Sequence, residues 1–334
     1  MTVRIGINGF GRIGRPVFRI LNERDDVEVV AVNDLFDTEK LGHLLKYDSV
    51  FGIYDKKIDI SPDSMSVDGK KTEFVAERDP ADIHWGDKGV DVVLECTGFF
   101  RTGELSRAHI DAGAKKVIIS APAKGVDNTI VIGVNDDTLT DDDTIISNAS
   151  CTTNCLAPVT KVLNDSFGVE QGLLTTIHSY TSDQKLQDTP HSKDPRRARA
   201  AAVNMIPTST GAAVAVGRVI PDLDGKLDGM AIRVPTPNGS VVDLVAVLSK
   251  STTKEEVDAA MKEAAEGSMK GILEYTEEPI VLTDIVGSRS SSIYDSGASM
   301  LLNGNMVKVI SWYDNELGYS TRLADLAVML GEKC

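Results

Sequence analysis

Apolar runs alternate with amphipathic stretches through the first half of the chain. The runs Val3 to Asn8 and Val27 to Val32 predict strands, and the residues between them have the spacing of a helix with one apolar face. This strand–helix–strand order is typical of a Rossmann-type, doubly wound α/β sheet. The same pattern predicts further strands at Val90 to Cys96, Lys116 to Ser120 and Thr129 to Val134.

The pattern changes after residue 150 and predicts a second, α+β domain with a mixed or antiparallel sheet. Leu227 to Val234 and Ser240 to Leu248 alternate apolar and polar residues, as antiparallel strands do. Residues 182 to 202 show little periodicity, and a loop of that length is usually functional or disordered. The other expected elements are helices at Cys151 to Asp165, after Gly211, Lys254 to Ala265 and Leu317 to Leu330, and strands at Leu173 to Ile177, near Ile280 to Asp284 and Met306 to Trp312.

A glycine-rich turn joins the first strand to the first helix. Gly9, Gly11 and Gly14 form a Gly-x-Gly-x-x-Gly motif, and Asp34 ends the second strand 20 positions after Gly14. The first two glycines let backbone approach a pyrophosphate, and the third lets the helix pack close to the strand. Asp34 is placed to accept hydrogen bonds from ribose hydroxyls, so the sequence predicts a dinucleotide site.

Ligands of doubly wound sheets lie beyond the carboxyl ends of the strands. Thr97 and Gly98 follow one predicted strand and Ser120 ends another, so these residues are candidates for lining the cofactor site. Arg78 is a further candidate, for the adenine end of the cofactor.

Cys151 is a candidate nucleophile. It falls in the expected first turn of a helix, where backbone N–H groups and the helix dipole favour a thiolate and should lower its pKa. Small polar neighbours leave room for a substrate and can donate hydrogen bonds to an oxyanion. The alternative is that Cys151 is a small buried apolar residue. Its four-residue spacing to Cys155 matches neither a zinc pair nor a thioredoxin pair, so no metal site is expected.

Composition excludes some classes of partner. The 35 basic and 50 acidic residues give a net charge of −15, which argues against general binding to nucleic acid or anionic membranes. Clusters such as Asp136-Asp137 and Asp141-Asp142-Asp143 are interpreted as solvated loop surface, and the excess reflects either ordinary acidity or adaptation to high salt. Few, scattered cysteines, no signal peptide and no membrane-length apolar run together predict a reducing cytoplasm.

Six motifs together resemble one family. In chain order they are Asn8 to Gly14 (Asn-Gly-Phe-Gly-Arg-Ile-Gly), Ser150 to Cys155 (Ser-Cys-Thr-Thr-Asn-Cys), His178 to Thr181, Ser209 to Ala213, Arg233 to Pro237 and Trp312 to Glu316. They span essentially the whole chain, which resembles glyceraldehyde-3-phosphate dehydrogenase. The resemblance implies an NAD-binding domain of residues 1–150 and 316–334, a catalytic domain of residues 151–315, and a homotetramer.

The resemblance also implies a reaction and a role for each site residue. The enzyme would be an NAD-dependent, phosphorylating aldehyde dehydrogenase of glycolysis and gluconeogenesis, converting glyceraldehyde 3-phosphate and inorganic phosphate to 1,3-bisphosphoglycerate. Cys151 would form a thiohemiacetal and then a thioester, with His178 as the base. The implied phosphate-binding residues are Thr181 and Arg233 for the substrate and Ser150, Thr152, Thr210 and Gly211 for inorganic phosphate. The implied NAD-binding residues are Gly9, Gly11, Arg12, Ile13, Asp34, Arg78, Thr97, Ser120, Asn315 and Tyr319.

Several alternatives remain open on the sequence. Either Arg197 or Arg199 would assist phosphate binding. A relative acting on erythrose 4-phosphate would share the same scaffold. A non-catalytic dinucleotide sensor would need only the first domain, so the Cys, His and phosphate-binding motifs argue against it.

Overall fold

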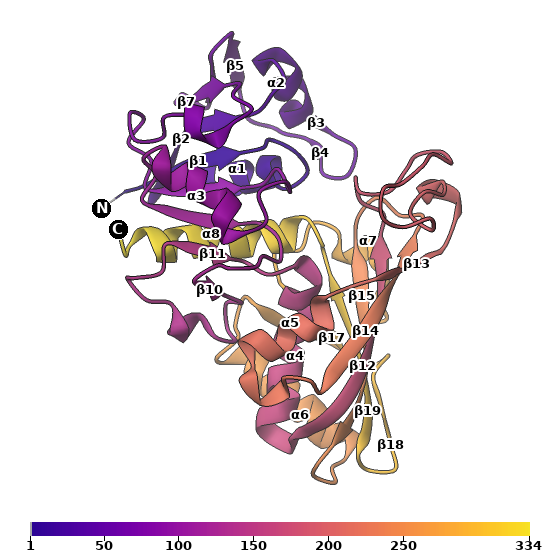
Figure 1. The fold of residues 1–334 in the computed structure, drawn as a ribbon. Coiled ribbons are helices and arrows are strands. Elements are labelled where there is room, and N and C mark those ends of the chain that lie inside the picture. The colour runs from indigo at the N-terminus through magenta and orange to yellow at the C-terminus, as the bar shows by residue number, and fades with distance from the viewer. Residues whose placement is uncertain (1) are drawn as a thin grey trace. The chain divides into compact units, whose positions relative to one another are not determined.

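A computed structural model describes residues 2–334 and divides them into two compact units (Figure 1). The first unit runs up to Ile130 and includes Asp137–Ala149 and Ser320–Cys334. The second contains Val131–Asp136 and Ser150–Tyr319. Within residues 2–334 no helix is long and apolar enough to cross a membrane.

The first unit is built on a nine-stranded sheet, in the order β10-β11-β9-β8-β1-β2-β7-β6-β5. Every neighbouring pair from β10 to β7 is parallel, and the last two pairs are antiparallel. The strands are β1 (Val3–Asn8), β2 (Val27–Asn33), β5 (Ile58–Ser61), β6 (Ser64–Val67), β7 (Lys70–Val75), β8 (Val92–Glu95), β9 (Lys116–Ile119), β10 (Asn128–Thr129) and β11 (Ile145–Ser147); β3 (Tyr47–Asp48) and β4 (Gly52–Ile53) form a separate pair.

The chain leaves β1 for neighbours on both of its sides, β2 and β8. This reversal of strand order is the switch point at which doubly wound sheets bind ligands. The helices of the unit are α1 (Gly14–Asn22), α2 (Thr38–Lys46), α3 (Gly103–Asp111) and the part of α8 (Leu317–Gly331) from Ser320 onward. Its short turns are η1 (Pro80–Asp82) and the part of η2 (Asp136–Thr138) from Asp137 onward.

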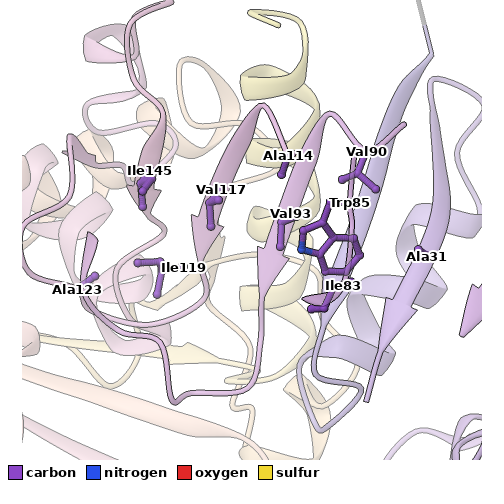
Figure 2. Close-up of a cluster of buried hydrophobic side chains, with 10 residues drawn as sticks. All are labelled: Ala31, Ile83, Trp85, Val90, Val93, Ala114, Val117, Ile119, Ala123 and Ile145. Atoms are coloured by element: carbon purple, nitrogen blue, oxygen red, sulfur yellow. The ribbon is translucent and has the colours of Figure 1, made fainter. Parts of the chain in front are cut away.

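A buried apolar cluster supports this sheet (Figure 2). Trp85 is its largest member and is fully buried, with Val93 and Val117 from neighbouring strands packed nearby. The ring also lies against Gly6 of β1, where an added Cβ would come within 2.7 Å of it. Close packing of this kind leaves little freedom to change a side-chain volume at the centre of the sheet.

The second unit contains an eight-stranded mixed sheet in the order β13-β14-β12-β15-β19-β17-β16, with β18 paired to β19. Helices α4, α5 and α6 lie along one face of it, and α4 contacts β12, β15, β17 and β19 (Figure 1). The strands are β12 (Val169–Ser179), β13 (Ile206–Ser209), β14 (Leu227–Val234), β15 (Ser240–Leu248), β16 (Leu273–Thr276), β17 (Ser292–Asp295), β18 (Met300–Leu302) and β19 (Met306–Tyr313). The helices are α4 (Cys151–Phe167), α5 (Ala212–Val219), α6 (Lys254–Glu266) and α7 (Leu282–Ile285), with short turns η3 (Ala201–Val203) and η4 (Pro221–Leu223).

The predicted fold class is confirmed, with one change in how the strands pair. β14 and β15 have the predicted bounds, but β12 lies between them, parallel to β14 and antiparallel to β15. The alternating pattern identified the two strands but did not show what separates them.

Two predicted strands are wrong for a shared physical reason. The strand expected at Thr129 to Val134 ends at Thr129, because the Asn135 side chain accepts a hydrogen bond from the Val131 N–H (2.9 Å) and turns the chain. The strand expected near Ile280 to Asp284 is replaced by α7, where the Asp284 carboxylate accepts from the Val281 N–H (2.7 Å). In both places a polar side chain takes a backbone N–H that a sheet would need.

The sequence suggested that the acidic run Asp141-Asp142-Asp143 is solvated surface, but this is not true of the whole run. Asp143 is buried, and its carboxylate accepts a hydrogen bond from the Thr140 N–H (2.8 Å). The buried ammonium of Lys116 donates to the carbonyls of Asp141 and Asp143. A cation from the sheet therefore holds this acidic loop against the first unit.

Candidate active site

Cys151 is the first residue of α4 in the second unit. Ser150 caps the helix, since its hydroxyl accepts a hydrogen bond from the Thr153 N–H (3.0 Å). Asn154 also donates from its side chain to the Ser150 carbonyl (3.0 Å). Small capping residues thus fix the first turn and leave the partly exposed Cys151 at the positive end of the helix dipole.

His178 lies near the end of β12 and faces Cys151. The distance from Cys151 Sγ to His178 Nε2 is 3.5 Å, within reach of a sulfur–nitrogen hydrogen bond. Sheet register pairs His178 with Arg233 on the parallel strand β14. The pair Cys151–His178 is the arrangement that a thiol nucleophile and its base require.

The other ring nitrogen of His178 has two neighbours with opposite demands. Nδ1 lies 2.7 Å from the Ser179 carbonyl oxygen, which can only accept, and 2.6 Å from Arg233 Nη1, which can only donate. A proton on Nδ1 satisfies Ser179 and leaves Nε2 free to take a proton at Cys151. A proton on Nε2 satisfies Arg233 and lets His178 donate toward sulfur. Each tautomer fits one of the two tasks of a histidine beside a nucleophilic thiol.

Tyr313, at the end of β19, is a site residue that the sequence reasoning missed. Its buried hydroxyl lies 2.9 Å from both Thr152 Oγ1 and Thr176 Oγ1, and its ring packs edge-on against His178. It therefore connects α4, β12 and β19 beside Cys151 and His178. The alternation along β19 gave a signal, because Tyr313 falls on the buried face of that strand.

The electrostatics of the pair favour neutral forms. Burial raises the pKa of the Cys151 thiol, against the direction predicted from the helix terminus, while Arg233 and hydrogen bonds from Thr152 act to lower it. Burial, followed by the Arg233 charge, lowers the pKa of His178 to about 3. Transfer of a proton from sulfur to Nε2 would leave the net charge of the pair unchanged.

The predicted phosphate-binding residues come from loops beside these strands. The Thr181 N–H donates to the Gln184 side chain (3.3 Å), and the Thr210 hydroxyl accepts from the Ala212 N–H (3.2 Å) at the start of α5. Gly211 is the residue before that helix and is exposed. Thr152, in contrast, is buried with its hydroxyl toward Tyr313.

The two arginines left open by the sequence differ in position. Arg197 is mostly covered, is paired with Asp183, and donates to the Ser209 carbonyl (3.3 Å) next to Thr210. Arg199 is exposed over 61% of its side chain and is paired with Asp188. Arg197 is therefore the arginine that contacts the segment carrying Thr210 and Gly211.

Asn315, directly after the buried Asp314 that follows β19, has a fixed orientation. Its side-chain oxygen accepts hydrogen bonds from the hydroxyls of Ser179 (2.9 Å) and Ser240 (3.0 Å). Its NH₂ group therefore faces away from the two serines, as a donor. Tyr319, in the first turns of α8, is buried.

In the first unit, the glycine motif forms a tight turn after β1. Gly9 has a positive φ of 97°, and a Cβ on Gly14 would lie 2.1 Å from the Gly9 carbonyl oxygen, so α1 can only begin this close to β1 with glycine there. Asp34, just past β2, accepts from the Phe10 N–H (2.8 Å) within the turn. The structure thus brings the motif and the acidic residue together.

Arg12 of this turn is paired with Asp48 on β3 (2.5 Å). Burial acts to raise the pKa of Asp48, but Arg12 and the N–H groups of Phe51 and Val50 outweigh it, so the pKa lies below its usual value. Ile13 is the N-cap position of α1. Asp48 gave no signal in the sequence.

The remaining candidates lie at or just beyond strand ends. Thr97 follows β8 and bonds to the Glu95 carboxylate, and the Ser120 N–H donates to the Glu95 carbonyl (3.0 Å). Arg78 is exposed, in the segment after β7. Among residues 2–334 no cluster of His, Cys, Asp and Glu could hold a metal ion.

Comparison with family models covers both halves of the chain. Residues 3–103 match the model described as "Glyceraldehyde 3-phosphate dehydrogenase, NAD binding domain", and residues 150–315 match "Glyceraldehyde 3-phosphate dehydrogenase, C-terminal domain". The chain belongs to the glyceraldehyde-3-phosphate dehydrogenase family.

Full-length relatives in this family support the assignment. The chain is 59% identical to glyceraldehyde-3-phosphate dehydrogenase 1 of Bacillus subtilis (strain 168) over 334 residues, covering 100% of this chain and 99% of the relative. It is 58% identical to the glyceraldehyde-3-phosphate dehydrogenase of Geobacillus stearothermophilus over 334 residues, with the same coverage. It is 56% identical to that of Mycolicibacterium smegmatis over 340 residues, covering 99% of both chains. The resemblance seen in the motifs is confirmed.

Arg233 should tune the reactivity of Cys151. Arg233→Met removes the charge that opposes protonation of both groups, so the pKa values of the thiol and of His178 should both rise. Because the thiolate forms as pH rises through the thiol pKa, the rate of alkylation by iodoacetamide should shift to higher pH in the variant. The measurement is the pH profile of Cys151 alkylation without substrate. Arg218→Met, on the exposed side of α5, is the matched control, and an unshifted profile for Arg233→Met would contradict the prediction.

Proposed function

We propose that this chain catalyses the reversible oxidative phosphorylation of glyceraldehyde 3-phosphate to 1,3-bisphosphoglycerate, with reduction of NAD, in glycolysis and gluconeogenesis. The proposal assigns residues 1–150 and 316–334 to the NAD-binding domain and residues 151–315 to the catalytic domain. The observation that supports it most directly is the 3.5 Å contact between Cys151 and His178 at the start of α4.

The chemistry follows from these two side chains. The thiol proton moves to His178 Nε2, the Cys151 thiolate attacks the aldehyde carbon, and His178 passes that proton to the carbonyl oxygen to give a thiohemiacetal. His178 Nε2 then removes the hydroxyl proton as a hydride leaves the same carbon, which gives a thioester. Inorganic phosphate attacks the thioester, forming the acyl phosphate and releasing the Cys151 thiolate. The tautomer with its proton on Nδ1, favoured by the Ser179 carbonyl, has Nε2 ready for the proton transfer.

Two sets of residues are proposed to bind the two phosphates. Thr181 and Arg233 hold the phosphate of the substrate. The start of α5, with Thr210 and Gly211, receives inorganic phosphate together with Ser150 and Thr152, since helix N-termini favour anions. The position of Arg197 beside Ser209 favours it over Arg199 as the additional cation.

NAD, when bound, supplies the hydride acceptor. The residues present fit it: Gly9 and Gly14 have no room for a Cβ, whereas a Cβ on Gly11 would meet nothing within 4 Å, which leaves the turn open to a pyrophosphate. Gly9, Gly11, Arg12 and Ile13 are proposed to hold the pyrophosphate and Asp34 the ribose. The further proposed contacts are Arg78, Thr97 and Ser120 on the adenosine side, Asn315 at the nicotinamide amide and Tyr319 near the nicotinamide ring.

Replacement of the catalytic pair should separate chemistry from cofactor binding. Cys151→Ser should remove nearly all turnover, because a hydroxyl is a poor nucleophile at neutral pH, while NAD binding remains. His178→Asn should slow hydride transfer by roughly 10²–10⁴-fold, the usual range for general acid–base catalysis. The measurements are NADH formation with glyceraldehyde 3-phosphate and phosphate, and NAD affinity by calorimetry.

Cys155→Ser is the matched control, because Cys155 is buried against Ser292 and Ser311 and has no proposed chemical role. Near-normal turnover in Cys151→Ser would refute the assignment of Cys151 as the nucleophile. Faster turnover of erythrose 4-phosphate than of glyceraldehyde 3-phosphate by the unmodified enzyme would refute the assignment of glyceraldehyde 3-phosphate as the substrate.

NAD should be preferred over NADP because of Asp34. An ionised carboxylate only accepts hydrogen bonds, so it suits two ribose hydroxyls and repels a 2′-phosphate. Its orientation is set by the N–H groups of Phe10 and Phe36. The ratio of kcat/KM with NAD to kcat/KM with NADP should fall by about tenfold or more in Asp34→Gly, because charged hydrogen bonds to the ribose are lost. An unchanged ratio would remove Asp34 from this role.

We further propose a cytoplasmic homotetramer. Exposed apolar side chains on the second unit, including Leu186, Val203 and Met205, suit an interface between copies. Four free cysteines favour a reducing compartment, which fractionation of source cells would check.

If the acidic excess is an adaptation to salt, the assembly should dissociate in dilute buffer, where self-repulsion is screened least. Sedimentation in low and high salt measures this, and a tetramer equally stable in both would leave ordinary acidity as the explanation.

A further inference from the structure

A buried carboxylate lies beneath the dinucleotide turn of the first unit. Glu95, the last residue of β8, has no exposed side-chain surface and accepts four hydrogen bonds. One oxygen accepts from the Asn8 amide (2.6 Å) and from His109 Nε2 (3.1 Å). The other accepts from the N–H (2.7 Å) and the hydroxyl of Thr97.

The geometry fixes the role of His109 in this network. His109 is fully buried on α3, and its Nδ1 lies 3.0 Å from the indole nitrogen of Trp85. An indole N–H only donates, so Nδ1 must accept and the proton of the neutral ring must be on Nε2. His109 therefore donates to Glu95, and Trp85, drawn beside Ile83 and Val90 in Figure 2, holds it in that tautomer.

Glu95 holds, through hydrogen bonds, the two segments that flank the glycine turn: Asn8 before it and Thr97 beside it. Asn8 directly precedes Gly9, and a Cβ on Gly9 would lie 2.8 Å from the Thr97 backbone nitrogen, so the turn packs against the peptide that Glu95 holds. Asn33 extends the network to β2, because its amide donates to the Asn8 side chain (2.7 Å) and its carbonyl accepts from the Gly9 N–H (2.8 Å). The ends of β1, β2 and β8 are thus joined at the switch point of the sheet.

We propose that Glu95 is a positioning residue for dinucleotide binding. Acting through Asn8 and Thr97, it sets the spacing between the glycine turn and the β8 end, so that the backbone N–H groups of the turn are in place before the pyrophosphate arrives. His109 and Trp85 keep the carboxylate in its orientation. The proposal rests on the NAD binding proposed above and is independent of the Cys151–His178 assignment.

Glu95→Gln tests this with little change of volume. One oxygen becomes an NH₂ group, which cannot accept from Asn8 and His109 or from Thr97, whichever way the amide turns. The dissociation constant for NAD, measured directly by calorimetry, should rise by about tenfold or more, the range expected when buried donors lose their acceptor. At saturating NAD, kcat and the KM for glyceraldehyde 3-phosphate should stay within about twofold of the unmodified values, because only cofactor binding is weakened.

Three further variants separate positioning from general stability. Thr72→Val removes another buried hydrogen bond of the same sheet, from Thr72 to the Val29 carbonyl (2.8 Å), without a link to the turn. It should lower the melting temperature and leave NAD affinity unchanged. His109→Gln can still donate to Glu95 and accept from Trp85, and should retain most of the affinity that His109→Leu loses, so this pair also tests the network if Glu95→Gln fails to fold.

The outcomes distinguish this proposal from the proposed function. NAD affinity in Glu95→Gln equal to that of the unmodified protein, or an equal loss in Thr72→Val, would overturn the positioning role. So would a fall in kcat with unchanged NAD affinity, or equal losses in His109→Gln and His109→Leu. Failure of the unmodified protein to bind NAD would instead refute the proposed function.

Discussion

The candidate active site depends on the start of helix α4 being held beside the end of strand β12. α4 packs across β12, β15, β17 and β19, and its first residue is Cys151. Tyr313 secures this arrangement with hydrogen bonds to Thr152 on the helix and Thr176 on the strand. Because these residues are buried and both threonine hydroxyls bond to the Tyr313 hydroxyl, a displacement of either element would leave polar groups without partners. The 3.5 Å separation of sulfur and imidazole is therefore set by packing and hydrogen bonds outside the pair.

Hydrogen bonds from neighbouring groups also fix the orientation of two other buried polar side chains. Asn315 is oriented by two serine hydroxyls, and the Glu95 carboxylate is surrounded by uncharged donors. Side chains held in this way need little reorganisation when a ligand binds. Rigid strand ends supply the positions, and neighbouring polar groups supply the orientation.

Local charge, and not net charge, decides what this acidic protein can bind. The chain carries a net charge of −15, yet Arg233 is paired in register with His178, and Arg197 lies against the Ser209 carbonyl. Part of the acidic excess is already engaged inside the protein, since the buried Asp143 carboxylate accepts a hydrogen bond from the Thr140 N–H. An anionic substrate therefore meets a local field that the total charge does not describe.

The sequence by itself determined those features that depend on neighbouring residues. The strand β1 and the alternating strands β14 and β15 have the bounds that the pattern predicts, and the glycine turn and the start of α4 lie where the motifs place them. Only the tertiary structure decided which distant residues meet. Periodicity shows which face of a strand is apolar but not the order of strands in a sheet, so the insertion of β12 between β14 and β15, and with it the pairing of His178 with Arg233, could not be read from the chain. Burial likewise reversed the expected direction of the Cys151 pKa, because desolvation depends on what the fold packs around the sulfur. Glu95, His109 and Trp85 carried no local signal, since their contacts join a strand, a helix and a loop that only folding brings together.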